Sequence, residues 1–202
     1  MSFDSIAPVY DSLSRMVYGK SIVAAQNHFL KYIPEGSHIL IVGGGTGWII
    51  DAIFEVNRTC SIVYLEASQK MLQKAQARVD ADDQPRVKFL FQSEMPSEGS
   101  YDVIITNFFL DLFPPHKLVS ILHQLKDRMK HDGRWIVTDF VDGGKLWQRL
   151  LLQLMYWFFK RISKIEATTL PPWSLLLAED GMQKVEEKHF YVGFIETAIY
   201  QK

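Results

Sequence analysis

A glycine-rich turn is the segment of this chain best suited to bind a ligand. Residues 43–47 read Gly-Gly-Gly-Thr-Gly, after the apolar run 38–42 and before the helical run 48–56. Glycine lets the backbone turn tightly and approach a ligand closely, because no Cβ intrudes. The start of the following helix adds unpaired N–H groups. The turn therefore predicts a small-molecule site beyond the carboxyl end of a buried strand.

An acidic residue follows the glycines at the distance expected of a sugar-binding group. Glu66 comes directly after the next apolar run, residues 61–65, and about 20 residues beyond the turn. A carboxylate accepts hydrogen bonds from both hydroxyls of a ribose with its two oxygens, which a neutral side chain cannot match. The alternative is that Glu66 caps a solvent-exposed loop. The glycine turn beside it favours ribose binding.

The glycine spacing distinguishes two kinds of ligand. Dinucleotide sites use Gly-x-Gly-x-x-Gly, whose third glycine would fall on Trp48 here. The spacing is instead Gly43-x-Gly45-x-Gly47, and a tryptophan at the start of the helix would crowd a pyrophosphate. S-adenosylmethionine carries no phosphate and needs only close backbone approach. The pattern therefore favours S-adenosylmethionine, and a nicotinamide-dependent oxidoreductase is the alternative.

Strands must alternate with helices to position these residues. The predicted strands cover residues 38–42, 61–65, 87–91, 101–106 and 134–139, and the predicted helices cover 48–56, 68–79, 116–129 and 145–162. Ser68 suits an N-cap, Pro114 and Pro115 suit a helix start, and Asp132-Gly133 suits a turn. Such apolar strands predict a parallel sheet with helices on both faces.

The C-terminal end has a different pattern. Residues 183–191 and 195–201 are two predicted strands, and no helix fits in the link 192–194, so they should form an antiparallel hairpin. The predicted fold is a Rossmann-like, doubly wound, mostly parallel seven-stranded α/β sheet with this hairpin at its end. We expect one domain over residues 1–202. It would comprise an N-terminal helical cap (1–35), a cofactor-binding core (36–140), a lid with substrate helices (141–180) and the hairpin (181–202).

Short motifs at four places match the pattern of one family. Residues 3–11 read Phe-Asp-Ser-Ile-Ala-Pro-Val-Tyr-Asp, residues 44–47 Gly-Gly-Thr-Gly, residues 66–72 Glu-Ala-Ser-Gln-Lys-Met-Leu and residues 129–134 Met-Lys-His-Asp-Gly-Arg. They resemble motifs of the ubiquinone and menaquinone C-methyltransferases and their relatives, in the class I S-adenosylmethionine-dependent methyltransferase superfamily. The resemblance covers roughly the first 140 residues.

This resemblance implies a methyltransferase with S-adenosylmethionine as its cofactor, and it assigns roles to residues. The implied cofactor-binding residues are Tyr10, Gly43, Gly44, Gly45, Thr46, Gly47, Glu66, Ala67, Met71, Gln92, Ser93 and Asn107. The glycines would face the methionine part, Glu66 would hold the ribose, and Ala67, Met71, Gln92 and Ser93 would contact the adenine. Asn107 would meet the cofactor amino group, and Tyr10 would close over the cofactor.

Three positions depart from the family pattern. Ile41 stands where an acid is common in the first strand, so one cofactor contact must be made differently or lost. Ser14 replaces an expected asparagine, and residues 107–112 differ from the quinone enzymes, which argues against a quinone substrate. Ile41 keeps a further alternative open, a non-catalytic binding protein on a methyltransferase fold.

Methyl transfer from a sulfonium needs no dedicated nucleophile, and a base is needed only if the acceptor must lose a proton. Asp111 is the one acid expected near the active-site mouth, as a base or a group that orients the acceptor; the alternative is a helix-start residue ahead of Pro114. The six histidines lack the spacing of a metal site, so no metal is expected.

The run 145–162 offers aromatic and thioether surface for a small apolar or aromatic acceptor. Packing on the sheet, a homodimer contact and contact with a membrane surface are alternatives. Its apolar stretch is too short to cross a bilayer.

The composition of the chain limits the kinds of partner and the cellular location that we expect. The formal net charge is -1 and the sequence pI is about 6.6. The chain therefore lacks the excess of positive charge that is typical of a nucleic-acid-binding protein. Cys60 is the only cysteine, which excludes an intrachain disulfide. The N-terminal residues lack an export-signal pattern, and we expect a cytoplasmic protein.

Overall fold

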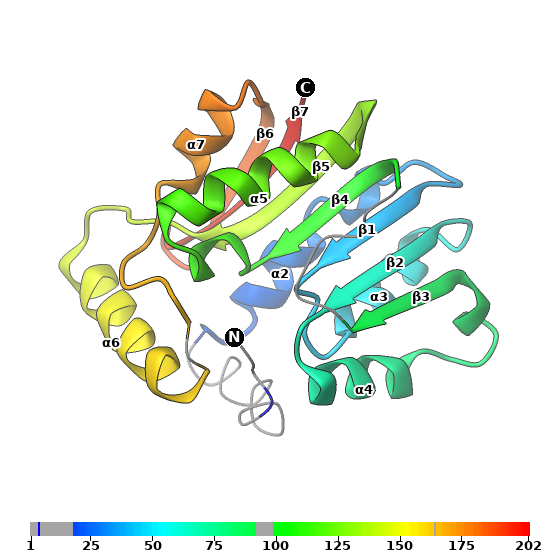
Figure 1. Cartoon of the computed structure of the whole chain (residues 1–202), viewed down its shortest axis with the longest axis horizontal. Helices are drawn as coiled ribbons and strands as arrows, with labels where there is room; N and C mark the ends of the chain where they lie inside the picture. Colours follow the sequence, from blue (N-terminus) through cyan, green and yellow to red (C-terminus); the bar gives the residue numbers. More distant parts are fainter. Residues whose placement is uncertain (1–3, 5–17, 92–98, 164) are drawn as a thin grey trace.

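The computed structural model describes residues 4, 18–91, 99–163 and 165–202, and these residues build one seven-stranded sheet (Figure 1). The strands are β1 (His38–Val42), β2 (Ser61–Glu66), β3 (Val87–Phe91), β4 (Tyr101–Asn107), β5 (Met129–Phe140), β6 (Gln183–Phe190) and β7 (Ile195–Gln201). Their order across the sheet is β3-β2-β1-β4-β5-β7-β6, and of these strands β7 alone runs in the direction opposite to the other six. The predicted mostly parallel sheet with a C-terminal antiparallel hairpin is confirmed.

Helices cover both faces of this sheet. They are α2 (Ser21–Asn27), α3 (Trp48–Val56), α4 (Gln69–Arg78), α5 (Pro115–Arg128), α6 (Leu146–Ile162) and α7 (Trp173–Glu179), with 3-10 turns η1 (Leu30–Tyr32), η2 (Gln84–Arg86) and η3 (Leu110–Leu112). α3 and α4 pack on one face, α5 and α7 pack on the other, and α2 contacts α3. α6 lies at the periphery, away from the middle of the sheet (Figure 1).

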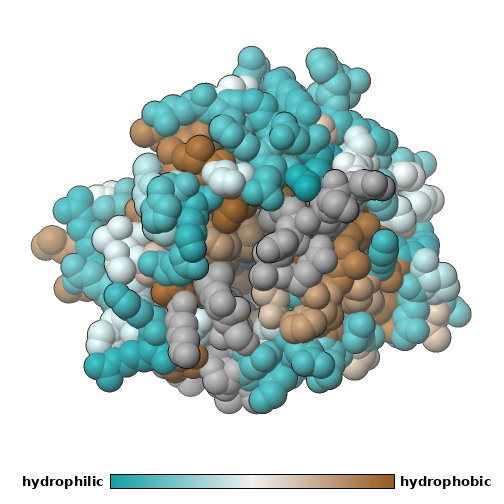
Figure 2. Space-filling model, viewed as in Figure 1, coloured by the Kyte–Doolittle hydropathy of each residue, from teal (hydrophilic) through white to brown (hydrophobic). Residues whose placement is uncertain are grey.

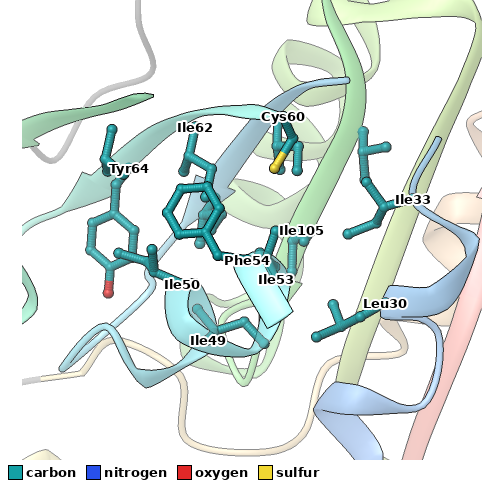
Figure 3. Close-up of a cluster of buried hydrophobic side chains, with 14 of the residues drawn as sticks. Leu30, Ile33, Ile49, Ile50, Ile53, Phe54, Cys60, Ile62, Tyr64 and Ile105 are labelled. Atoms are coloured by element: carbon teal, nitrogen blue, oxygen red, sulfur yellow. The ribbon is translucent and has the colours of Figure 1, made fainter. Parts of the chain in front are cut away.

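Alternation along each central strand explains the two layers. Ile39 and Ile41 of β1 face α3, whereas Leu40 and Val42 face α5, because successive side chains of a strand point to opposite faces. Figure 3 shows the first of these cores, with side chains of α3 packed against β2 and β4. Cys60 lies within it and is fully buried, so it is a core residue as the sequence predicts.

The strand order creates a switch point beside the glycine turn. β1 pairs with β2 on one side and with β4 on the other, and both pairings are parallel. Val42 is in register with Thr106, so the residues that follow β1 and β4 leave the sheet side by side. Ligands of open parallel sheets bind at such a point.

The predicted turn at Asp132-Gly133 is wrong, because these residues belong to β5. Met129 pairs with Tyr101 and Arg134 pairs with Val103, so residues 130–133 form a bulge within the strand. The predicted helix 68–79 begins one residue later, and Ser68 is its N-cap: the Ser68 hydroxyl accepts a hydrogen bond from Met71 N.

α6 is buried on one side only. Leu152, Met155 and Tyr156 pack with Phe140 and Phe194 at the ends of β5 and β7. No helix in the described part of the chain is long and apolar enough to cross a bilayer.

Candidate functional site

The glycine turn is held by the neighbouring strand. Gly43 N donates a hydrogen bond to Leu65 O at 2.9 Å, and Gly45 N donates to Glu66 Oε2 at 2.9 Å. The Tyr64 hydroxyl donates to Gly45 O at 3.0 Å. Three consecutive residues of β2 therefore fix the backbone of the turn.

The glycines of the turn serve different purposes. A Cβ on Gly44 would lie 2.3 Å from the Tyr64 ring, and a Cβ on Gly47 would lie 2.5 Å from Ala75 Cβ of α4. These two glycines permit close packing inside the protein. Gly45 has a φ of +67°, and a Cβ there would meet nothing within 4 Å. Its open side therefore offers space to a ligand.

Glu66 lies at the tip of β2 and is 6% exposed. Its Oε1 accepts a hydrogen bond from Ser68 N at 2.7 Å, and its Oε2 accepts the one from Gly45 N. Burial raises the pKa of this carboxyl, backbone N–H groups including those of Ser68 and Gly45 oppose the rise, and nearby Asp4 adds to it. Each carboxylate oxygen has a second lone pair, so Glu66 retains acceptor capacity for a diol.

Asp4 connects the N-terminal region to this corner of the site. Its Oδ1 accepts hydrogen bonds from the Ser68 hydroxyl at 2.6 Å and from Lys70 N at 3.0 Å. A carboxylate at a helix start is favourable, because the first N–H groups of α4 have no partner within the helix. Ala67 is half-buried, and Met71 is buried in the first turn of α4.

A cavity of about 60 Å³ lies against the glycine turn. Its walls are Gly43 to Thr46, Trp48 and Ile49 of α3, Ile22 and Gln26 of α2, Asn107 at the end of β4, and Phe108 directly after it. Gln26 Oε1 and Asn107 Oδ1 are buried, and neither has a hydrogen-bond partner among the described residues. An unpaired buried oxygen costs free energy, so these two acceptors suit a ligand that donates hydrogen bonds.

Phe108 forms the aromatic part of this wall. It has a φ of +50°, a region that non-glycine residues rarely occupy, and its N donates to Thr138 O at 2.7 Å. Its ring centroid lies 4.7 Å from that of Phe140 at the end of β5. The strained backbone thus places an aromatic ring directly after Asn107.

Asp111 lies in the interior and not at the expected mouth: it is 3% exposed and lines neither of the two cavities described here. It does not cap α5, which begins at Pro115. Burial and the neighbouring Asp139 carboxyl raise its pKa well above the ordinary value. Burial also raises the pKa of Asp139, to about 7.

Asp139 fixes the loop that follows β4. Its Oδ2 accepts hydrogen bonds from the N–H groups of Phe109, Leu110 and Asp111, and its Oδ1 accepts one from Phe140 N. The Tyr156 hydroxyl of α6 donates to Asp111 O at 3.1 Å. Asp139 and Tyr156 therefore fix the backbone of residues 109–111, which directly follow Asn107 and Phe108.

A second cavity of about 540 Å³ lies among the end of β5, α6, residues 168–172 and α7. Phe140 is part of its wall, whereas Phe108 is part of the wall of the small cavity. The contact between these two rings therefore lies between the cavities. The large cavity falls within the predicted lid region, residues 141–180.

The histidine spacing gave no metal site, but the fold brings Glu187, His189 and Glu196 together on the β6–β7 hairpin. Lys184 Nζ lies 2.7 Å from a carboxylate oxygen of each glutamate. The Lys184 ammonium group already pairs with both acids, so the cluster is an ion-pair network.

The structure brings most of the predicted cofactor residues to one corner. Gly43, Gly44, Gly45, Thr46 and Asn107 line the small cavity, and Glu66 contacts the turn beside it. Tyr10, Gln92 and Ser93 lie outside the described residues. Sequence reasoning missed Gln26, Asp4 and Asp139. An acid ending an apolar strand was a usable signal for Asp139, whereas Gln26 stands in a short helix without any motif.

Comparison with known proteins indicates the class of protein to which this chain is similar. Residues 40–135 match a family model described as a methyltransferase domain. The demethylmenaquinone methyltransferase of Lactococcus lactis subsp. lactis (strain IL1403) is 24% identical over 214 residues, covering 99% of this chain and 82% of that protein.

Two solved enzymes share the fold. The mitomycin 7-O-methyltransferase MmcR superposes with a TM-score of 0.74 and 17% identity, covering 100% of this chain and 61% of that one. The O-methyltransferase NcsB1 of neocarzinostatin biosynthesis, in complex with S-adenosylmethionine and 2-hydroxy-5-methyl naphthoic acid, gives a TM-score of 0.69 and 16% identity, covering 98% and 58%. The chain spans less than two thirds of either enzyme.

The domain match and the sheet topology together identify a class I methyltransferase fold with its glycine turn in place. The domain match, the curated relative and the shared fold support the class I S-adenosylmethionine-dependent methyltransferase superfamily that the motifs predict. The methyl acceptors in the names of its relatives differ from one to the next.

Proposed function

We propose that this chain transfers the methyl group of S-adenosylmethionine to a small apolar or aromatic acceptor. The observation that carries the proposal is the pair of buried, unpaired oxygens, Gln26 Oε1 and Asn107 Oδ1, beside the open side of Gly45. The donor supplies a methyl group already activated by its sulfonium. The residues of the chain need only hold the donor, orient the acceptor and exclude water.

The two oxygens fit the amino group of the donor. An ammonium group has three N–H donors and no acceptor, so it would satisfy both oxygens at once. Ile41, which stands in place of the acid common in the family, is buried in the core and offers no polar contact. Gln26 reaches the same cavity from α2 and can supply the missing acceptor.

Glu66 fits the ribose, because both of its oxygens retain a lone pair and the carboxylate is fixed by two backbone N–H groups. The cavity also argues against a pyrophosphate, since Trp48 forms part of its wall. These features favour S-adenosylmethionine over a nicotinamide dinucleotide.

Aromatic rings after β4 and β5 support an apolar or aromatic acceptor. Phe108 and Phe140 lie in contact next to Asn107, where an acceptor would meet the donor. The names of two relatives are consistent with this class, since one is called a demethylmenaquinone methyltransferase and the other was solved with a naphthoic acid. A cytoplasmic location and a homodimer remain predictions from the sequence.

Titration calorimetry with two ligands tests the assignment of the two oxygens. S-adenosylhomocysteine contains the amino-acid part of the donor, and 5′-methylthioadenosine lacks it. Gln26→Met and Asn107→Leu should each weaken S-adenosylhomocysteine binding by about tenfold or more, as expected for hydrogen bonds to a charged group. Both variants should bind 5′-methylthioadenosine as the wild type does.

Gln124→Met, an exposed position on α5, is the matched control and should bind both ligands normally. Equal weakening of both ligands by Gln26→Met would remove Gln26 from the amino-group site. Tight binding of NAD with no binding of S-adenosylhomocysteine would overturn the proposed function. Failure of the wild type to bind any of these ligands would favour the non-catalytic alternative.

A further inference from the structure

The outer side of α6 is apolar over about three turns. Leu146, Leu150, Leu154 and Trp157 are 79%, 66%, 60% and 55% exposed. Their spacing puts them on one face of the helix, opposite the buried Leu152, Met155 and Tyr156. We call these four residues the outer face of α6. Hydrophobic residues reach the left edge of Figure 2, beside the start of α6 as Figure 1 draws it, whereas the surface over α5 is mostly hydrophilic.

Positive charge adjoins this face at the C-terminal end of α6. The sequence contains five lysines and arginines and no acidic residue between Asp142 and Glu166, although the whole chain carries a net charge of -1. Lys160 and Arg161 lie at the C-terminal end of the helix, where the Arg161 guanidinium sits 4.6 Å from the centre of the Trp157 ring. Asp142 neutralises Arg149 at the other end, with 3.1 Å between Nε and Oδ2.

We propose that the outer face of α6 docks on the surface of an anionic lipid bilayer. Leucine and tryptophan side chains would enter the boundary between headgroups and acyl chains, and the flanking cations would attract anionic lipids. Tryptophan favours this boundary, because its ring is apolar and its N–H remains in a polar layer. A helix of 17 residues is about 25 Å long, less than the hydrocarbon thickness, so it lies along the surface.

A second copy of the chain fits this face less well. A two-fold contact brings the same patch of both copies together. Lys160 and Arg161 of one copy would then approach the cations of the other, and the helix carries no acid to separate them. A bilayer of anionic lipids satisfies the charge and the apolar face together.

The full chain tests this proposal by sedimentation with phosphatidylcholine vesicles, with and without phosphatidylglycerol. We expect binding to the phosphatidylglycerol vesicles only, and we expect added salt to weaken it. Leu150→Gln combined with Leu154→Gln should reduce binding by at least about tenfold, since two leucines leave the apolar layer. Leu175→Gln on α7, which is 57% exposed in the wild type, is the matched control and should bind normally.

Far-ultraviolet circular dichroism establishes that each variant is folded. If the double variant is unfolded, Lys160→Gln with Arg161→Gln replaces it, and the same loss on anionic vesicles is expected. Absence of wild-type binding, or binding that neither variant reduces, overturns the proposal. A dimer in light scattering that the leucine variant dissociates, without vesicle binding, would assign the face to a second copy. None of these measurements requires the methyl donor, so the result is independent of the proposed function.

Discussion

Gly45 donates its backbone N–H to Glu66 Oε2 across 2.9 Å, so the residue with open space for a ligand is tied to the acid expected to hold the ribose. Replacing Glu66 should therefore affect both the conformation of the turn and the binding of the ligand. Glu66→Ala should weaken S-adenosylhomocysteine binding by about 2–3 kcal/mol, the usual range for hydrogen bonds to a charged group. Titration calorimetry measures this, and an unchanged affinity would remove Glu66 from the site.

Replacement by alanine should have different effects on stability and on ligand binding at two glycines of the turn. Gly47→Ala places a Cβ against α4 in a left-handed backbone, and we expect it to lower the free energy of unfolding by about 2 kcal/mol or more. Gly45→Ala strains only the backbone, which costs about 1–2 kcal/mol, and its Cβ enters the open space. Denaturant unfolding should show the larger loss of stability for Gly47→Ala, and calorimetry with S-adenosylhomocysteine should show the larger loss of binding for Gly45→Ala. The reverse pattern would contradict the assignment.

Ser68 should be a structural residue of the ribose side. Its hydroxyl accepts from Met71 N at the start of α4 and donates to Asp4. Ser68→Ala should lower the free energy of unfolding by about 1 kcal/mol, the usual cost of a lost N-cap. Ser120→Ala on α5 is a control at an exposed serine and should change stability much less. Equal effects of the two changes would show that the cap is unimportant.

The buried pair Asp111 and Asp139 predicts a pH-dependent stability. The pKa of Asp139 is about 7 in the folded chain, against an ordinary value of 3.8. The folded chain therefore binds protons more strongly than the unfolded chain between these two values. The stabilisation is complete below the lower value and is lost as the pH rises through about 7.

Asp111→Asn should flatten this dependence, because it removes the second buried carboxyl, whose own pKa is raised well above the ordinary value by burial and by Asp139. Unfolding free energies measured between pH 5 and 8 on the wild type, Asp111→Asn and Asp132→Asn provide the comparison. Asp132 has a fully exposed side chain, and its variant should follow the wild type. A slope in Asp111→Asn as steep as in the wild type would contradict the coupling.

The part of the site near β1 and β2 was predictable, because its geometry follows from local rules. The glycines and Glu66 each directly follow an apolar run that is plain in the sequence, and parallel strands place their carboxyl ends together. The hairpin was also predictable from a local rule, because the link between its strands is too short to contain a helix.

The remaining features depend on contacts between distant residues. Gln26 joins the cavity only because α2 packs beside α3, and no local pattern fixes that contact. The partnership of Asp111 with Asp139 joins residues 28 apart, so Asp111 looked like a mouth residue in the sequence alone. The bulge at residues 130–133 contains Asp132-Gly133, which is typical of a turn. The sequence therefore predicted that this strand begins at residue 134, whereas β5 begins at Met129.

α2 packs on β6 and β7 as well as on α3, so one short helix joins the small cavity beside the glycine turn to the far edge of the sheet. A ligand held by Gln26 would restrain this helix, and by thermodynamic linkage it would stabilise the elements that the helix braces. Saturation with S-adenosylhomocysteine should therefore slow amide hydrogen exchange in the β6–β7 hairpin, more than 150 residues along the chain from Gln26.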